Sequence, residues 1–113
     1  MEKVVFTTGG TGGHIYPALS IAKKVREKGI DTLFIGTKHR MEKDIVPNEN
    51  FRFIGLDVLP LRSVKSVIKM ITATISAIKL LKKEKPTKII AFGNYITIPV
   101  LIAANVLRIP YYL

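Results

Sequence analysis

A strand-like run leads directly into a glycine-rich string, and a helical pattern follows at once. The run is Lys3-Val4-Val5-Phe6-Thr7, whose β-branched and aromatic side chains are typical of a buried strand. The string is Gly9-Gly10-Thr11-Gly12-Gly13-His14, and the helical pattern covers about residues 16–28. Four glycines in five residues weaken any regular element, so they predict a tight turn in which the backbone takes left-handed conformations or closely approaches a ligand. The chain therefore begins with a strand–turn–helix unit.

This glycine string permits two interpretations. Backbone amides at a helix N-terminus attract anions, so the string can cradle a phosphate or pyrophosphate; alternatively, it serves only close packing of strand on helix. A nucleotide-binding P-loop is excluded because no Gly-Lys-Ser/Thr follows. A dinucleotide site is disfavoured, because Ile15 stands where the third glycine belongs and no acid ends the second strand-like run, residues 32–36.

Strand-like and helical patterns alternate along the whole chain, which predicts an α/β fold with a Rossmann-like, doubly wound parallel sheet. We expect strands at residues 3–8, 32–36, 51–56, 88–92 and from about 111, with helices at about 16–28, 41–46 (ended by Pro47), 61–83 and after 96. In the first helix, Pro17 suits the first turn. Its core face would carry Ala18, Ile21, Ala22 and Val25, and Gly29 would end it. Strands one and four flank the switch point of such a sheet, so Thr11–His14 should face residues 93–95 across one crevice.

Residues 61–83 combine an apolar stripe with lysines. Apolar residues recur at three- and four-residue steps: Val64, Val67, Ile68, Ile71, Ile75, Ile78 and Leu81. One interpretation is a helix that turns this stripe to the core and has a solvated basic flank. The other is a basic amphipathic helix that lies on an anionic bilayer. The residues predicted to associate with a membrane are Leu61, Arg62, Val64, Lys65, Ile68, Lys69, Ile71 and Lys79.

Composition limits the class of protein. A chain of 113 residues with 48% hydrophobic residues suits a single domain, 1–113, with a real core. It has no cysteine, hence no disulfide framework, and we expect neither a signal peptide nor a transmembrane span. Residues 62–88 hold eight Lys or Arg and one Glu, a net charge of +7, which suggests an anionic partner.

Three blocks of sequence resemble the MurG family of bacterial glycosyltransferases. The first is Gly9 to Leu19, the second is Leu33 to Thr37 with Met41-Glu42 and Val46-Pro47, and the third is Phe92-Gly93-Asn94-Tyr95-Ile96. The resemblance covers this whole chain but only about the first third of such an enzyme. Asn94 departs from the pattern, because the family usually has a second glycine there. Asparagine tolerates the left-handed backbone, but close approach of a ligand is in doubt.

The resemblance implies the N-terminal half of a GT-B-type, inverting glycosyltransferase. Such enzymes move N-acetylglucosamine from UDP-GlcNAc to undecaprenyl-pyrophosphoryl-MurNAc-pentapeptide (lipid I), which forms lipid II for peptidoglycan synthesis. They need no metal or other cofactor, and they work as peripheral proteins on the cytoplasmic face of the cell membrane. The chain would then be the acceptor domain, cut within its fifth strand, and alone inactive, because the C-terminal donor domain is absent.

Residue roles also follow from the resemblance. Thr11, Gly12 and Gly13 match the loop that touches the donor, whereas Gly9 and Gly10 would shape the loop and help to receive the acceptor pyrophosphate. Asn94 and Tyr95 would bind substrate. His14 matches a histidine beside the reacting centre, where an imidazole with an ordinary pKa of about 6.5 can act as a base or position the substrate.

Two other functions compete with this one. A membrane-associated binding subunit would complement a separately encoded donor domain. A basic nucleic-acid-binding module is disfavoured, because aromatic residues do not interleave with the basic ones and so offer no stacking platform.

Overall fold

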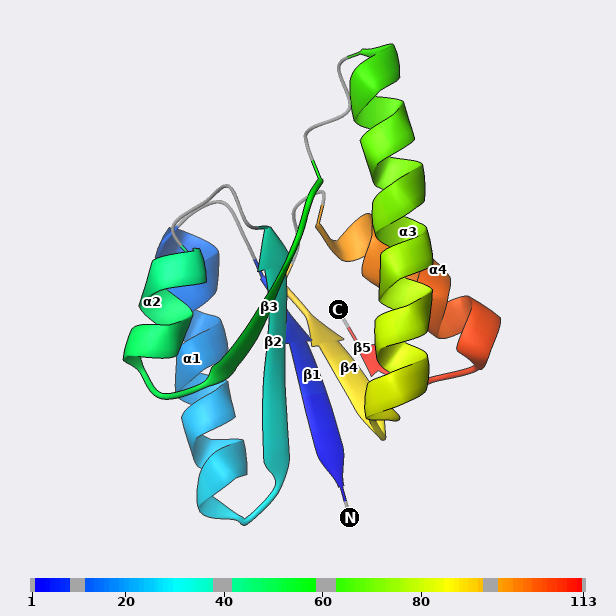
Figure 1. Ribbon diagram of the computed structural model, residues 1–113. Helices are drawn as coiled ribbons and strands as arrows, with labels where there is room; N and C mark the ends of the chain where they lie inside the picture. The colour runs from blue at the N-terminus through cyan, green and yellow to red at the C-terminus, as the bar shows by residue number, and fades with distance from the viewer. Residues whose placement is uncertain (1, 9–11, 38–41, 59–62, 93–95, 113) are drawn as a thin grey trace.

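The protein is a parallel five-stranded sheet between two layers of helices (Figure 1). The computed structural model describes residues 2–8, 12–37, 42–58, 63–92 and 96–112, without the side chains of residues 12–14 and 42. The strand order is β3-β2-β1-β4-β5, and every pairing is parallel. The order reverses between β1 and β4, so the predicted doubly wound α/β fold is confirmed.

The elements follow the predicted alternation, with boundaries that differ by a few residues. Their bounds are β1 Lys3–Thr7, α1 Gly12–Glu27, β2 Asp31–Thr37, α2 Glu42–Asn48, β3 Arg52–Leu56, α3 Val64–Glu84, β4 Lys88–Ala91, α4 Thr97–Leu107 and β5 Tyr111–Tyr112. Alternate side chains of β1 point to opposite faces of the sheet. Val4 and Phe6 join one core with α1 and Val46 of α2, whereas Val5 joins a second core with α3 and α4.

Helix α1 begins earlier than the sequence predicts. It includes Gly12 and Gly13, the last two glycines of the string, which take helical geometry. Glycine is tolerated there because the first turn of a helix does not depend on its side chains. Pro17 therefore lies inside the helix and not in its first turn. The predicted core face is also partly wrong: Ala18 and Ala22 are buried, but Ile21 is 41% exposed. Gly29 follows the helix with φ +78°, as its predicted role as the helix end requires.

The apolar periodicity of α3 predicts that its large apolar residues face the core. In the structure the opposite face of the helix is buried. Ser66, Met70, Ala73, Ala77 and Leu81 are its buried residues. Most of the predicted core stripe is exposed, namely Val64, Val67, Ile68, Ile71 and Ile75. Both sets have helical spacing, but they are offset by two residues, which is about 200° around a helix. The buried face consists mainly of small residues because α3 packs closely against α4. Helix α4 contributes Val100, Ala103 and Ala104 to the same core.

The remaining boundary corrections have simple causes. Helix α2 runs through Pro47 to Asn48, because a proline in the last turn needs only the helical φ and loses one hydrogen bond. Helix α3 starts at Val64 because Ser63 caps it: the Ser63 hydroxyl accepts from the Ser66 amide, and the Ser66 hydroxyl accepts from the Ser63 amide.

An ion-pair network joins α3 to the sheet at the end where the strands begin. The Glu84 carboxylate accepts from Lys3 Nζ of β1 at 2.8 Å and from the Arg52 guanidinium of β3 at 3.1 and 3.2 Å. Its side chain is only 8% exposed. These hydrogen bonds lower the pKa of Glu84 to about 2, Arg52 contributing most. The network fixes the C-terminal end of α3, whereas its N-terminal end rises beyond the sheet (Figure 1).

Candidate functional site

The strands β1 and β4 end side by side, at the switch point of the sheet. Thr7 is in register with Ala91, and the Phe92 amide donates to the Thr7 carbonyl at 2.9 Å. On the other side of β1, the Thr8 amide donates to the Ile35 carbonyl at 3.4 Å. β1 and β4 therefore end beside each other at the carboxyl edge of the sheet. Residues 9–11 and 93–95 lie outside the described residues, so the crevice expected between Thr11–His14 and residues 93–95 stays a prediction.

Threonine hydroxyls are buried at this carboxyl edge of the sheet. Thr7, Thr8, Thr37 and Thr97 are all less than 9% exposed. The hydroxyls of Thr7 and Thr8 have no hydrogen-bond partner within the part of the chain that the structure describes. A buried, unpaired hydroxyl costs stability, so two of them directly before the glycine string mark a polar site. Sequence reasoning missed these two threonines. The sequence does place them at the end of an apolar strand, where a buried position would usually hold an apolar residue.

The first turn of α1 projects from the same edge. Gly12, Gly13 and His14 form this turn, so their backbone amides lie among those that a helix leaves unpaired. The turn contains no acidic residue that would compete for these amides. Pro17 has no amide hydrogen and cannot donate to the Gly13 carbonyl, which leaves that carbonyl without its helical partner. The N-terminus of this 16-residue helix can thus donate amide hydrogen bonds to an anion at the carboxyl edge of the sheet.

The other predicted substrate-binding residues lie outside the described residues. These are Gly9, Gly10, Thr11, Asn94 and Tyr95. Their neighbours Thr8 and Ile96 are both buried. The roles predicted for the whole set, with His14, remain predictions.

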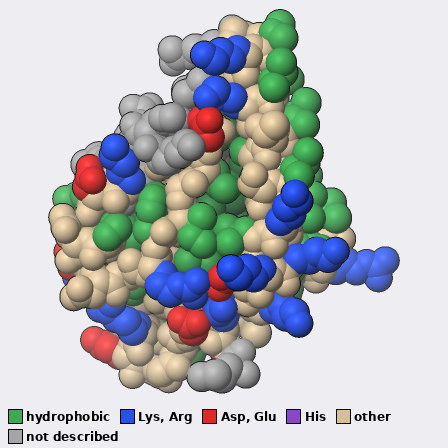
Figure 2. All heavy atoms as spheres, in the orientation of Figure 1, with side chains coloured by type: hydrophobic (Ala, Val, Ile, Leu, Met, Phe, Trp, Pro, Cys, Tyr) green, Lys and Arg blue, Asp and Glu red, His purple; other side chains and the backbone are tan. Residues whose placement is uncertain are grey.

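The predicted membrane-facing residues divide into groups. Leu61 and Arg62 lie outside the described residues. Val64, Ile68 and Ile71 are 76%, 56% and 57% exposed, and Figure 2 shows hydrophobic side chains along the outer face of α3 with Lys and Arg side chains near both ends. Lys65 and Lys79 are exposed.

Lys69 differs from the other lysines of this group. Its Nζ donates to both carboxylate oxygens of Asp57, at 2.9 and 3.0 Å, and its side chain is 26% exposed. Asp57 directly follows β3, so this pair ties α3 to the carboxyl edge of the sheet. The positive charge of Lys69 is thereby largely neutralised within the protein.

The described residues show neither a metal centre nor a membrane span. Across residues 2–8, 12–37, 42–58, 63–92 and 96–112, no three His, Cys, Asp or Glu side chains gather in a way that could hold a metal ion. None of the helices, over the same residues, is long and apolar enough to cross a membrane. The shifted pKa values of Glu84 and Arg52 belong to the opposite edge of the sheet, where the strands begin.

Comparison with known proteins identifies the family. The model of the glycosyltransferase family 28 N-terminal domain matches residues 4–113. The chain belongs to this family. Its sequence is 51% identical over all of its 113 residues to the UDP-N-acetylglucosamine–N-acetylmuramyl-(pentapeptide) pyrophosphoryl-undecaprenol N-acetylglucosamine transferase of Fusobacterium nucleatum, and covers 32% of that protein. It is 44% identical to the protein of the same name from Halothermothrix orenii, with 96% of this chain and 31% of that protein covered.

Solved structures agree with the family 28 assignment. The crystal structure of Acinetobacter baumannii MurG matches with a TM-score of 0.90 and 29% identity, over 98% of this chain and 34% of that one. The UDP-GlcNAc 2-epimerase of Methanocaldococcus jannaschii shares the fold alone, with a TM-score of 0.70 at 22% identity, over 98% of this chain and 30% of that one. The family 28 chain spans about a third of the length of the curated relatives that it matches.

Proposed function

We propose that this chain is the acceptor-facing part of an inverting glycosyltransferase that moves N-acetylglucosamine from UDP-GlcNAc to lipid I. The observation that carries the proposal is the family 28 match, together with a glycine string that follows β1 in the sequence directly after the β1–β4 switch point. The names of the relatives supply the donor and the acceptor. Two features support an anionic ligand at this edge. The Thr7 and Thr8 hydroxyls have no hydrogen-bond partner among the described residues, and the amides of the first turn of α1 have no partner within the helix.

In this proposal the glycine string and His14 have separate tasks. Residues 9–13 receive the anionic parts of the two substrates, since glycine lets a pyrophosphate approach the backbone. His14 stands beside the sugar hydroxyl that attacks the anomeric carbon. An inverting transfer must remove the proton of that hydroxyl, and a neutral imidazole can accept it. Residues 94 and 95 close the other side of the crevice, and no step calls for a metal ion.

A chimeric enzyme tests the proposal directly. We would join this chain to the remaining two thirds of the Fusobacterium nucleatum relative and measure transfer from UDP-GlcNAc to a lipid I analogue. The chimera should be active, and the 113-residue chain alone should be inactive. His14→Ala should lower kcat by about 10²–10⁴-fold if His14 is the base, whereas a positioning role would mainly raise KM.

The other histidine of the sequence provides a matched control, because His39→Ala should change neither constant. An inactive chimera, beside an active unmodified relative, would refute the proposal.

We also propose that the outer face of α3 rests on the cytoplasmic surface of an anionic membrane. Exposed Val64, Val67, Ile68, Ile71 and Ile75 give this face an apolar stripe. Lys79 and Lys82 continue the same side of the helix at four- and three-residue steps and are exposed. An apolar stripe that shallowly enters the headgroup region, beside lysines that each contribute about 1 kcal/mol near an anionic surface, suits peripheral binding.

Vesicle binding distinguishes a membrane surface from a solvated helix. The chain should bind vesicles that contain phosphatidylglycerol, and added salt should weaken that binding. Ile68→Ser with Ile71→Ser should abolish it without unfolding the chain, because both side chains are more than half exposed.

The matched control is Ile98→Ser with Ile102→Ser on α4, where both side chains are also partly exposed. Equal losses in the two double variants, or no vesicle binding at all, would contradict a membrane role for α3.

A further inference from the structure

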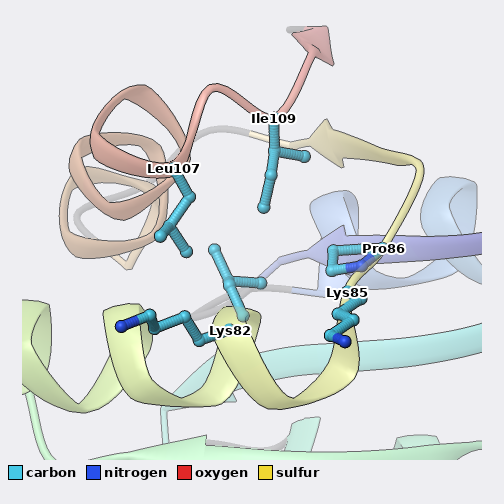
Figure 3. A pocket seen from close by; sticks show the side chains of 6 residues that line it. Lys82, Lys85, Pro86, Leu107 and Ile109 are labelled. Atoms are coloured by element: carbon cyan, nitrogen blue, oxygen red, sulfur yellow. The ribbon is translucent and has the colours of Figure 1, made fainter.

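An open pocket lies at the amino edge of the sheet, the end opposite to the glycine string. It has a volume of about 320 Å³ and is lined by Leu81, Lys82, Lys85, Pro86, Leu107 and Ile109. Figure 3 shows Leu107 and Ile109 pointing from the end of α4 and the following segment toward α3, with Lys82 and Lys85 on the other wall. The proposed glycosyl transfer uses none of these residues.

The walls of this amino-edge pocket are apolar. Leu81 and Pro86 are buried, whereas Leu107 and Ile109 are half-buried and pack against the core of α3 and α4. They stay partly exposed because α3 and α4 both end here. The left-handed residues Lys85 and Arg108, with φ 49° and 59°, turn the chain away from each helix end. The pocket therefore has room for at least one large apolar side chain.

The rim of the pocket carries Lys82 and Lys85. Lys85 also lines the neighbouring hollow, together with Glu2, Asp31 and Glu84. The acid nearest in sequence, Glu84, forms its ion pairs with Lys3 and Arg52. Across the described residues, the ion pairs of the structure include neither Lys82 nor Lys85. Figure 3 shows both lysines on the α3 side of the pocket, with their side chains extending in different directions. Exposed Lys79 and Lys83 extend the positive surface along α3.

We propose that this amino-edge pocket docks an acidic polypeptide segment, which inserts one bulky apolar side chain between α3 and α4 and places its carboxylates beside Lys82 and Lys85. Two features favour a polypeptide over a small molecule. The pocket is at the small end of the range for ligand sites and is open, so it cannot enclose a whole ligand. A single apolar anchor surrounded by complementary charge is instead the arrangement typical of protein–protein contacts. The proposal is independent of the glycosyl transfer.

Fluorescence anisotropy with designed peptides tests the docking site. The probe is a short fluorescein-labelled peptide of glutamate and aspartate with one central leucine, titrated with the 113-residue chain. A sister peptide carries serine in place of the leucine. The leucine peptide should bind about tenfold more tightly than the serine peptide, since the anchor supplies a large share of the affinity. Equal binding of the two peptides would overturn the proposal, because attraction by charge alone needs no pocket.

Charge variants locate the binding. Lys82→Glu with Lys85→Glu should weaken binding of the leucine peptide about tenfold. Lys24→Glu with Lys28→Glu, on and just after α1, is the matched control: both double variants lower the formal charge from +10 to +6. The control should change affinity by less than about twofold, since distant exposed charges are screened by salt.

Equal losses in the two variants would overturn the proposal. The proposal would also be overturned if the Lys82 and Lys85 changes weakened binding to phosphatidylglycerol vesicles but not binding to the peptide. The surface would then bind lipid. Circular dichroism of each variant confirms that the fold is intact.

Discussion

Replacing Glu84 by glutamine tests the network that joins α3 to the sheet. The carboxylate is 8% exposed and accepts from Lys3 and Arg52, which lowers its pKa from 4.5 to about 2. A shift of that size corresponds to about 3 kcal/mol of stability at neutral pH, because one pKa unit is 1.36 kcal/mol. Glu84→Gln should therefore lower the free energy of unfolding at pH 7 by about 2–4 kcal/mol.

The pH dependence of this loss identifies its cause. The pKa of Glu84 is depressed in the folded state, so the stabilisation is complete above the unfolded pKa of about 4.5 and is lost as pH falls toward 2. Linkage with these two pKa values leaves less than half of the stabilisation at pH 3. Urea denaturation of both proteins between pH 7 and pH 3 should thus show the difference shrinking by more than half. A difference that stays constant with pH would refute the electrostatic explanation.

Glu49→Gln is the matched control for this prediction. Glu49 also forms an ion pair, with Lys23 at 3.3 Å, but the two side chains are 42% and 46% exposed. An exposed pair is screened by solvent and typically contributes less than about 1 kcal/mol. The control should therefore have little effect at any pH. An equal loss at both positions would mean that burial does not set the strength of these pairs.

Three further predictions concern α3. Ala77→Leu should lower the free energy of unfolding by about 1–3 kcal/mol in urea denaturation, because Ala77 is fully buried, whereas Ile75→Ser at a half-exposed position should cost less than about 1 kcal/mol; the reverse order would refute the assignment of the two faces. Ser63→Ala should cost about 1 kcal/mol in the same measurement, through loss of the helix cap, and no loss would contradict the capping role. Lys69→Met should weaken vesicle binding less than Lys79→Met in a sedimentation assay, because Asp57 already neutralises Lys69; equal weakening would contradict that account.

The glycine string shows what sequence reasoning could reach at the candidate site. Strand-like residues before it and helical residues after it placed the turn at the carboxyl edge of a parallel sheet, and the pairing of Thr7 with Ala91 bears this placement out. The start of α1 at Gly12 was missed, because a pair of glycines is more typical of a turn than of a first helical turn. The buried Thr7 and Thr8 were also missed, because a threonine at a strand end is ordinary until its burial is known.

Local sequence was sufficient to predict the class of fold, the order of its elements and the position of the glycine turn. Each depends on the spacing of apolar residues and on backbone preferences, which act between near neighbours. Which face of α3 is buried was decided only by tertiary packing. Large apolar residues at Ile68 and Ile71 gave the stronger periodic signal, but close contact with α4 required the small Ala73 and Ala77 inside. That contact joins residues far apart in the sequence, so no local pattern records it, and the exposed apolar stripe of α3 results from it.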